Sequence, residues 1–401
     1  MSTRAPLSLE EAQARLLSLA APLPVETLPV RDCLGRHLAD PLIARRTQPA
    51  CNLSAMDGYA IRSGAFGGPW TVIGESAAGH PFEGSLGPEQ AIRIATGAVA
   101  PAQADSIVLQ EDVARTGNLI TLTGTPPPPP GRHIRKAGSD FATGGFLLDT
   151  GAPVGPAQIG LAIAAGHMDL PVRRRARLVI VDSGDELATD ATACALHQIP
   201  ASNGAVLASL TAPLADSRTI GPIPDDVAAL RNALDAASEA DVIVTSGGAS
   251  VGDHDVIRPA LEAWGADLEF WRVAIKPGKP ILVARRGSQI VIGLPGNPVS
   301  SYVTAFLFLL PLLRHLSGAG DVLPRTIKAT LGAPLMPIGK RREFLRAHWN
   351  GETVTPLSVQ DSGALSALSA SNALIDRAAG APALEAGEEV RIYSLHNGGM
   401  I

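Results

Sequence analysis

Val242–Asp255, which reads VIVTSGGASVGDHD, decides the fold, because β-branched residues run straight into a turn rich in glycine and serine. A short β-branched run that ends in paired glycines is typical of a buried strand followed by a polar turn. A similar apolar run at Leu178–Val181 is separated from it by helical stretches after Ser202 and Asp225, and another at Ile290–Ile292 follows a helical stretch near Asp255–Ala263. This alternation predicts a parallel sheet with helices on both faces.

The segments on either side of this alternation have different patterns of apolar residues, glycine and proline. Ser8 and Glu11 form a capping-box pattern, which predicts an amphipathic helix near the start of the chain. Short apolar runs broken by Gly and Pro at 69–148, and again after Arg325, predict β-rich units. The sequence therefore predicts a multidomain α/β plus β protein, with an N-terminal region at 1–172 that holds a β-rich module at about 46–148, a central doubly wound α/β domain with a mostly parallel sheet at 173–322, and a small C-terminal β domain at 323–401.

Two further stretches are strongly apolar or rigid. Tyr302–Leu313 is the longest apolar run, and it is well short of the ~20 residues that a membrane-spanning helix needs. It predicts a buried helix that begins near Val299. Pro126–Pro130 fits neither a helix nor a central strand, so it predicts a stiff extended loop within or beside the β-rich module, whose role the sequence does not give.

The bulk composition narrows the class of function. The 401 residues carry a net charge of −5, so the chain has no general attraction for nucleic acid or for an anionic membrane. Cys33, Cys51 and Cys194 are few, odd in number and without CxxC spacing, which favours neither a disulfide framework nor a zinc site. The first residues lack a basic start followed by an apolar run. We expect a cytoplasmic protein.

Three polar turns follow predicted strands, at the sheet edge where open α/β sheets bind ligands, and the first two contain acidic residues. Asp182–Leu187, DSGDEL, offers carboxylates for a divalent ion or a proton, and a merely solvated acidic turn is the alternative. In the turn after Val244, paired glycines let backbone amides approach an anion, and Asp255 can reach a metal ion. The alternative there is a turn in which glycine serves only the backbone angles.

Basic and rigid turns come next along the chain. Ile275–Pro280, IKPGKP, projects two lysines from a short loop with Arg272 just upstream, which suits anion binding, and a solvent-facing basic turn is the alternative. Gly293–Ser300, GLPGNPVS, opens the apolar helix, whose N-terminal amides favour a negative group. A rigid turn and a phosphate site both remain open for it.

In their order and spacing, these strings resemble the molybdopterin molybdenumtransferase family, called MoeA in bacteria and represented in animals by the C-terminal domain of gephyrin. The resemblance runs along nearly the whole chain. It includes the upstream string Asn52–Ala60, NLSAMDGYA, which alone indicates only a turn with packing side chains. Its most specific elements are Ser54–Ala60, Gly184–Leu187, Ser246–Asp255, Ile275–Pro280 and Gly293–Ser300.

The resemblance implies an activity and its partners. Family members insert molybdate into adenylated molybdopterin and release AMP, with a divalent cation such as Mg²⁺ assisting. They are elongated homodimers whose active cleft lies between the α/β domain of one chain and the N-terminal region of its partner. The adenylyltransferase of the same pathway and molybdoenzyme chaperones are further implied partners, and neither nucleic acid nor a membrane is expected.

The resemblance also assigns residues. Glu186 and Asp255 match the catalytic carboxylates and metal ligands, and Asp57 and Asp225 are further catalytic candidates. The pyrophosphate linkage of the substrate and the molybdate dianion are both negatively charged and need cations nearby, which is the role implied for the basic residues. The implied substrate-binding residues are Thr96, Asp140, Ser246, Gly247, Gly248, Ser250, Arg272, Lys276, Lys279, Pro280, Asn297, Pro298, Arg346 and Ser362.

Departures from the family pattern are modest. Arg272 stands where lysine is frequent, Ser139 where an acidic residue precedes Asp140, and Asp182-Ser183 replaces a Ser-Thr pair. A planar guanidinium in place of an ammonium can alter the preference among oxyanions. Three alternatives stay open: a tungstate-specific homologue, a non-catalytic molybdopterin-binding scaffold, and the related adenylyltransferase, which lacks the long N-terminal region and the C-terminal β domain.

Overall fold

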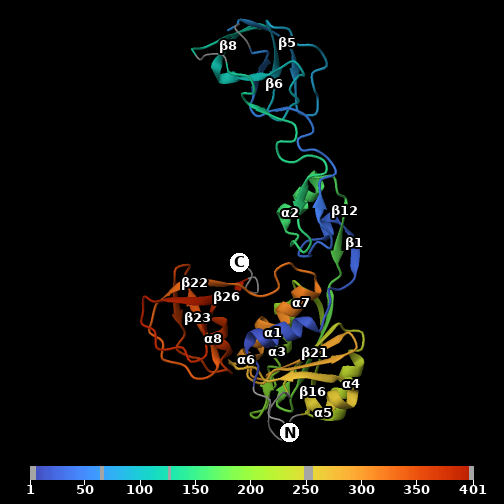
Figure 1. Ribbon diagram of the computed structural model, residues 1–401, viewed down its shortest axis with the longest axis vertical. Helices are drawn as coiled ribbons and strands as arrows, with labels where there is room; N and C mark the ends of the chain where they lie inside the picture. Colours follow the sequence, from blue (N-terminus) through green and yellow to red (C-terminus); the bar gives the residue numbers. More distant parts are fainter. Residues whose placement is uncertain (1–5, 64–66, 125–127, 248–255, 397–401) are drawn as a thin grey trace.

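The computed structural model describes residues 6–63, 67–124, 128–247 and 256–396. The molecule is elongated, with a β-rich module at one end, a small connecting unit in the middle and a broad α/β body at the other end (Figure 1). The C-terminal β domain lies beside that body. The β-rich module is therefore far from the central sheet within one chain.

A six-stranded mixed sheet forms the centre of the α/β body. Residues from one strand alternate between its two faces, because successive side chains point to opposite sides. The order across the sheet is β16 (Ala215–Ile223), β13 (Ala176–Ser183), β17 (Val242–Ser246), β21 (Gln289–Leu294), β20 (Leu282–Arg286) and β18 (Asp267–Trp271). The first four strands are mutually parallel, and β20 is antiparallel to both of its neighbours.

Helices cover both faces of this sheet, which confirms the predicted doubly wound α/β fold. Leu178 and Ile180 pack against one layer of helices, and Val179 and Val181 pack against the other. The first layer contains α1 (Leu9–Ser18), α3 (Asn203–Thr211) and the helix that starts at Pro298, and the second contains α4 (Val227–Ala236) and α5 (Ile257–Trp264).

The helix α1 comes from the start of the chain but packs on the central sheet. Its capping box is formed, since Ser8 Oγ accepts a hydrogen bond from the Glu11 amide and the Glu11 carboxylate accepts one from the Ser8 amide. Leu9, Ala12 and Leu16 are buried in the same core as the sheet. Figure 1 shows α1 beside α7 (Leu310–Leu316), so the N-terminal region contributes its first helix to the α/β body.

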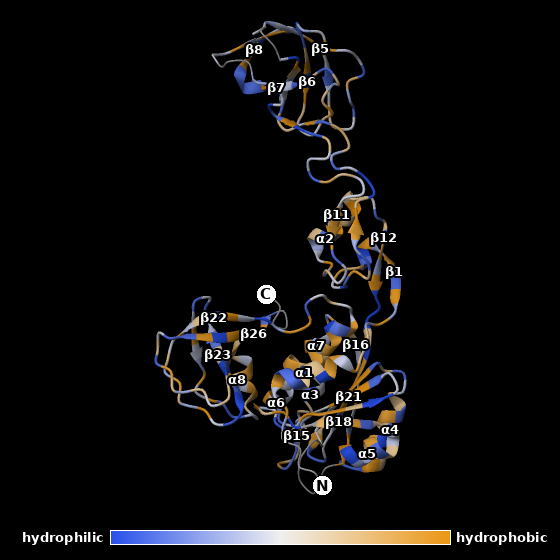
Figure 2. Ribbon diagram, viewed as in Figure 1, coloured by the Kyte–Doolittle hydropathy of each residue, from blue (hydrophilic) through white to orange (hydrophobic). Residues whose placement is uncertain are grey.

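The longest apolar segment is a core helix. It runs from α6 (Pro298–Thr304) through a π-helical turn at Ala305–Leu309 into α7. By length and composition Pro298–Leu316 could cross a membrane, but 89% of its apolar window is buried inside the protein. Figure 2 shows the hydrophobic helices and strands gathered at the centre of the body. The prediction of a buried helix is confirmed.

The C-terminal domain is a small closed β structure docked on that helix. Phe306 of the π turn and Tyr393 of the domain make an edge-on ring contact at 5.8 Å between centroids, and Phe344 stands 6.1 Å from Tyr393. Its strands are β22 (Thr326–Leu331), β23 (Arg342–Trp349), β24 (Thr353–Pro356), β25 (Ala373–Arg377) and β26 (Glu389–Ser394), and β19 (Ile275–Lys276) of the central domain joins β23 in parallel.

The rest of the N-terminal region forms two separate units. The connecting unit has its own small core around Leu38, Val154 and Val172, and pairs β1 (Val25–Pro29) with β12 (Asp169–Arg173). The distal module is a six-stranded sheet in the order β7 (Ser106–Leu109), β4 (Gly58–Ile61), β6 (Gln90–Ile94), β5 (Trp70–Ser76), β9 (Leu119–Leu122) and β8 (Val113–Thr116).

Candidate functional site

A cavity of about 410 Å³ opens at the carboxyl ends of β13 and β17, where the fold places ligand sites. We call it the strand-end pocket. The ionisable residues among its described lining are both acidic, Asp182 and Glu186. Ser246, Gly247, Asn297 and Pro298, all expected from the sequence, also line it, together with Ser202 and Asn203.

Asp182 lies at the buried floor of this pocket. Only 4% of the surface of this residue is exposed, and Oδ2 accepts a hydrogen bond of 3.1 Å from the Gly204 amide. Oδ1 has no hydrogen-bond partner. Burial raises the pKa of Asp182, and the Gly204 hydrogen bond opposes that shift only in part. Gly204 leaves room for this carboxyl, since a Cβ there would stand 2.3 Å from Oδ2.

The turn after β17 is held close to the turn after β13. Gly247 has a φ of +102°, and an added Cβ would lie 2.0 Å from the carbonyl oxygen of Ser183. Only glycine fits both conditions. Asn203 Nδ2 donates to Ser246 Oγ at 2.8 Å and to the Gly296 carbonyl at 2.7 Å. Three chain segments thus meet at one edge of the pocket.

Glu186 is exposed at the pocket, and Asp225 stands behind it. The carboxylate of Glu186 folds back toward Gly184, where a Cβ would meet it at 2.6 Å. Asp225 Oδ1 accepts a hydrogen bond of 2.8 Å from Ser183 Oγ, and its amide donates to Asp185. Asp225 therefore orients the strand-end turn and does not line the pocket.

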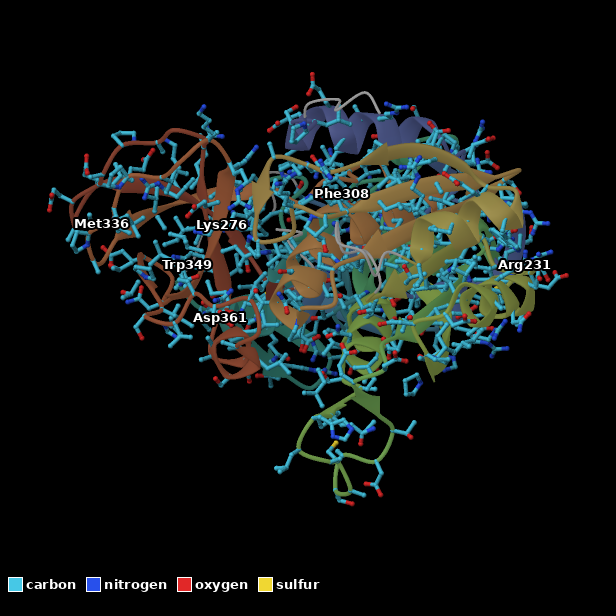
Figure 3. The ribbon with its side chains drawn as sticks, turned by 90° about the horizontal axis from the view of Figure 1, so that it is seen from below. Arg231, Lys276, Phe308, Met336, Trp349 and Asp361 are labelled. Carbon is cyan, nitrogen blue, oxygen red and sulfur yellow. The ribbon has the colours of Figure 1, made fainter. Side chains whose placement is uncertain are left out.

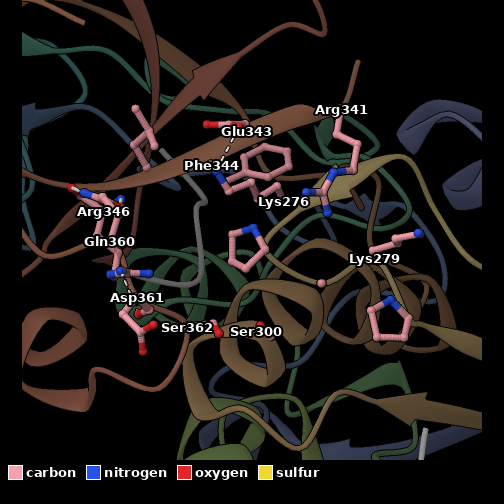
Figure 4. A pocket seen from close by; sticks show the side chains of 14 residues that line it. Lys276, Lys279, Ser300, Arg341, Glu343, Phe344, Arg346, Gln360, Asp361 and Ser362 are labelled. Carbon is pink, nitrogen blue, oxygen red and sulfur yellow. Dashed lines mark hydrogen bonds and ion pairs between the residues drawn. The ribbon is translucent and has the colours of Figure 1, made fainter. Parts of the chain in front are cut away.

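A second cavity, of about 360 Å³, lies between the central and C-terminal domains. We call it the basic pocket. Lys276, Lys279, Pro280, Arg346 and Ser362, all expected from the sequence, line it (Figure 4). Arg341 is the fourth basic residue in the lining, beside Lys276, Lys279 and Arg346. The lining also contains two carboxylates, Glu343 and Asp361, so the formal charge of the pocket is +2. Figure 3 shows Lys276 and Asp361 on the side of the C-terminal domain that faces the central body.

Arg346 is the most deeply buried cation of the basic pocket, with 1% of its surface exposed. Nη2 donates to the carbonyl oxygens of Val359 and Asp361, and Nε has no hydrogen-bond partner. Burial lowers the pKa of Arg346, while the Asp361 carboxylate acts in the opposite direction. A buried guanidinium with an unused donor is suited to an anionic ligand.

The two pockets meet at one short wall. Asn297 Nδ2 donates to Ser362 Oγ at 3.0 Å, and the Val299 amide donates to the Ser362 carbonyl at 3.0 Å. Asn297 and Gly363 line the strand-end pocket, whereas Ser300 and Ser362 line the basic pocket. The start of α6 and the C-terminal domain therefore separate an acidic site from a basic one.

Two expected residues, Asp57 and Thr96, lie in the distal module instead. Asp57 Oδ1 accepts hydrogen bonds from the Thr96 amide at 2.6 Å and from Thr96 Oγ1 at 2.9 Å. These two hydrogen bonds are the largest contribution to the lowered pKa of Asp57, and the positive charge of Arg93 lowers the pKa further. Within one chain the distal module is at the far end from both pockets (Figure 1). Asp140 is exposed outside the six-stranded sheet, and its amide donates to the Gln48 carbonyl at 3.1 Å.

The remaining expectations have mixed outcomes. Arg272 does not line either pocket; its backbone has a φ of 87° and its carbonyl accepts from the Leu7 amide. Gly248, Ser250 and Asp255 lie outside the described residues.

The two pockets also contain residues that the sequence motifs did not single out: Asp182, Asn203, Ser300, Arg341, Glu343, Gln360 and Asp361. Asp182 and Ser300 stand inside the quoted motifs, so their position was the signal, whereas Glu343 and Gln360 have no local signal.

Comparison with known proteins covers the whole arrangement. Residues 7–166 match the family profile "MoeA N-terminal region (domain I and II)", 179–315 match "Probable molybdopterin binding domain", and 328–395 match "MoeA C-terminal region (domain IV)". A Pyrococcus horikoshii molybdopterin biosynthesis moeA protein has a similar structure, with a TM-score of 0.83 and 27% identity over 97% of this chain and 99% of that one.

Curated relatives agree with the structural match. Molybdopterin molybdenumtransferase 2 of Mycobacterium tuberculosis is 34% identical over 388 residues, which cover 92% of this chain and 95% of the relative. The molybdopterin molybdenumtransferase of Haemophilus influenzae is 34% identical over 317 residues, 78% of each chain. With three family profiles in order and two pockets where the motifs predict them, this chain belongs to the molybdopterin molybdenumtransferase family.

Proposed function

We propose that this chain inserts molybdate into adenylated molybdopterin and releases AMP, as the last step that produces a molybdenum-bearing pterin cofactor. The observation that carries the proposal is the pair of adjoining pockets, one acidic and one basic, which meet where Asn297 and Val299 contact Ser362. A reaction between a nucleotide-linked pterin and a small oxyanion needs two such neighbouring sites.

The basic pocket is the proposed oxyanion site. Its formal charge of +2 balances a dianion such as molybdate, and its donors come from several directions. Arg346 is rigidly held by Val359 and Asp361, while Lys276 and Lys279 reach in from the opposite loop. Size and charge are alike for molybdate and tungstate, so this chemistry accepts both ions.

The strand-end pocket is the proposed site of the adenylated pterin. Paired backbone segments at Gly247 and Gly296 bring amides and carbonyls to its edge, and Asn203 and Asn297 add side-chain amides. Because its described ionisable lining is acidic, a pyrophosphate there needs a cation to offset repulsion from Asp182 and Glu186.

The residues present fit a magnesium ion. Mg²⁺ binds through one or two carboxylates together with substrate phosphates and water. Glu186 and the unpartnered Oδ1 of Asp182 supply such oxygens, and Asp255, which lies outside the described residues, is the other proposed ligand. The bound cation would neutralise negative charge at the phosphorus from which AMP departs. Ser183 and Asp225 keep the acidic turn in place.

Asp57 gives a reason to propose a homodimer. Its carboxylate, held ionised by Thr96, lies in the distal module, so it reaches a central site only if that site belongs to a partner chain. We propose a cytoplasmic homodimer in which Asp57, Thr96 and Asp140 of one chain complete the strand-end pocket of the other. The adenylyltransferase that makes the substrate and molybdoenzyme chaperones that receive the product are the further proposed partners.

The test is AMP release from purified protein supplied with adenylated molybdopterin, Mg²⁺ and either molybdate, tungstate or no oxyanion. We expect oxyanion-dependent AMP release and metal on the pterin. Glu186→Gln and Asp255→Asn should keep the fold and lower the rate at least about 100-fold, because they remove charges that act in the transition state. Near wild-type turnover in both variants would contradict these roles, and no AMP release with any oxyanion would support a binding scaffold instead.

A further inference from the structure

The basic pocket contains an ion pair that its ligand must disturb. Lys276 Nζ lies 3.1 Å from Glu343 Oε1, and both residues line the cavity (Figure 4). Strand β19 carries Lys276 and β23 carries Glu343, and the two are Cα partners in the parallel pairing that joins the central domain to the C-terminal domain. The pairing therefore fixes the carboxylate next to this lysine.

The two partners of this pair are held very differently. The Glu343 side chain is 14% exposed, whereas the Lys276 side chain is 53% exposed. Glu343 also faces Arg377 across the β23–β25 pairing, and Arg377 is a buried residue with 2% exposure. Glu343 raises the pKa of Arg377, against the effect of burial, so the carboxylate has a second cation to remain beside. Lys276 is the partner that is free to reorient.

We propose that Glu343 is an affinity-setting residue of the oxyanion site, which competes with the bound oxyanion for Lys276. The proposal rests on the proposed function of the basic pocket. In the structure Lys276 is paired with Glu343. When a dianion enters, Lys276 turns to it, and the Glu343 carboxylate is left facing Arg377 and a nearby negative ligand.

This competition weakens ground-state binding of the oxyanion. Partly exposed ion pairs are worth little, so Lys276 exchanges partners easily, but the repulsion between Glu343 and the ligand remains while the ligand is bound. A transferase needs that weakness, because an oxyanion held too tightly in its pocket is not delivered to the pterin. With Glu343 ionised, the formal charge of the pocket is +2, equal in magnitude and opposite in sign to that of the incoming dianion.

The test is the dissociation constant of molybdate and of sulfate for the full-length protein, measured by calorimetry, with Glu343→Gln and Glu343→Asp. Glu343→Gln should bind both anions roughly tenfold more tightly, as removal of one nearby charge at an effective dielectric constant of about 20 allows. It should also release AMP more slowly at saturating molybdate. Glu343→Asp keeps a negative charge near Arg377 but moves it away from Lys276, so its dissociation constants should lie between those of wild type and Glu343→Gln.

A matched control separates local from general electrostatics. Glu389 forms an exposed ion pair with Lys328 at 2.8 Å in the same domain and does not line the basic pocket, so Glu389→Gln should leave both constants unchanged. Lys276→Met should bind both anions weakly. Adding Glu343→Gln to Lys276→Met should tighten anion binding by less than the tenfold expected for Glu343→Gln alone.

The outcomes separate the two proposals. A folding defect weakens binding, so tighter binding by a variant that is no more stable than wild type cannot come from a purely structural role. Unchanged or weaker binding by Glu343→Gln, in a protein whose wild type binds molybdate, overturns the role of Glu343 alone. Absence of molybdate binding to the wild type, despite AMP release, overturns the oxyanion assignment of the basic pocket and this role with it.

Discussion

Asp182 is a residue whose local chemistry disfavours the ionised form. Its carboxyl is buried, one oxygen accepts from Gly204, and the other oxygen has no hydrogen-bond partner. Leaving a buried polar group unsatisfied costs about 1–3 kcal/mol, and more for a charged one. Such a group is kept at the floor of the pocket at the expense of stability, which is the pattern expected of a residue that serves a ligand.

This gives a prediction for Asp182→Asn. The pKa of Asp182 is raised in the folded state, so its stabilising contribution is complete below the unfolded-state pKa near 3.8 and is lost as the pH rises through the folded-state value. The amide cannot ionise and can still accept from Gly204. We expect the variant to be more stable than wild type by roughly 1 kcal/mol at pH 8, with the gap narrowing toward pH 4.

Urea unfolding at a series of pH values measures this difference. Asp190→Asn is the control, because Asp190 is exposed and the Thr192 hydrogen bonds lower the pKa of its carboxyl, so its removal should not stabilise the protein at pH 8. An Asp182→Asn variant less stable than wild type at pH 8 would show that the carboxylate has a stabilising partner.

At the level of elements, the connecting unit meets α7 through a half-buried histidine. His37 Nδ1 lies 3.0 Å from Ser317 Oγ at the end of that helix. Burial, with Arg314 and Arg36 nearby, lowers the pKa of His37 from 6.5 to about 4. The folded protein therefore holds this side chain neutral where the unfolded chain protonates it.

The consequence is a loss of stability in mild acid. Between pH 6.5 and 4 the unfolded state binds a proton that the folded state does not, so the free energy of unfolding falls as the pH falls, by at most about 3 kcal/mol from this group. His37→Gln should flatten that slope, as followed by thermal unfolding from pH 7 to 4. The exposed His348→Gln is the control, and an equal flattening in both variants would contradict the role of His37.

For the whole molecule, the proposed homodimer predicts that one chain does not contain a complete site. Asp57 lies in the distal module, and Lys276 lies in the basic pocket at the other end. In a two-fold dimer, a mixed pair formed from Asp57→Asn and Lys276→Met chains has one site with both defects and one site with neither.

Mixing these two inactive variants should therefore restore activity. If subunits exchange freely, half of the dimers are mixed, and about a quarter of the wild-type number of sites are intact. AMP release after co-refolding or co-expression measures the gain. Mixing Lys276→Met with Lys279→Met should restore nothing, because both residues line the pocket of their own chain and every site in the mixture keeps one defect. A monomer by light scattering at working concentration, or no recovery in the first mixture, would contradict a shared site.

Much of the central fold was predictable because its signals are local. The strands at Leu178–Val181, Val242–Val244 and Ile290–Ile292 are apolar runs followed by polar turns, and the structure confirms each of them. Strand β16 was not predicted, because it lies at the sheet edge and its sequence, ADSRTIGPI, is largely exposed and polar. Edge strands lack the two-sided burial that makes a strand visible in sequence.

The site divides in the same way. Lys276, Lys279 and Ser246 stand in short motifs whose spacing carries the signal, and the structure places them at the two pockets. Glu343 was invisible, because its role depends on a strand pairing between residues 67 positions apart. Asp182 was visible only as part of an acidic turn, since nothing in the sequence distinguishes a buried carboxyl from a solvated one.

By itself, the sequence determined the α/β alternation, the capped first helix, the buried apolar helix and the family motifs, because each depends on neighbours within one element or turn. Tertiary structure alone decided that α1 packs on the central sheet, that the C-terminal domain contributes Arg346 and Ser362 to the basic pocket, and that Asp57 lies far from both cavities. The physical reason is that these relations depend on which surfaces bury one another, and burial is settled by the packing of distant segments.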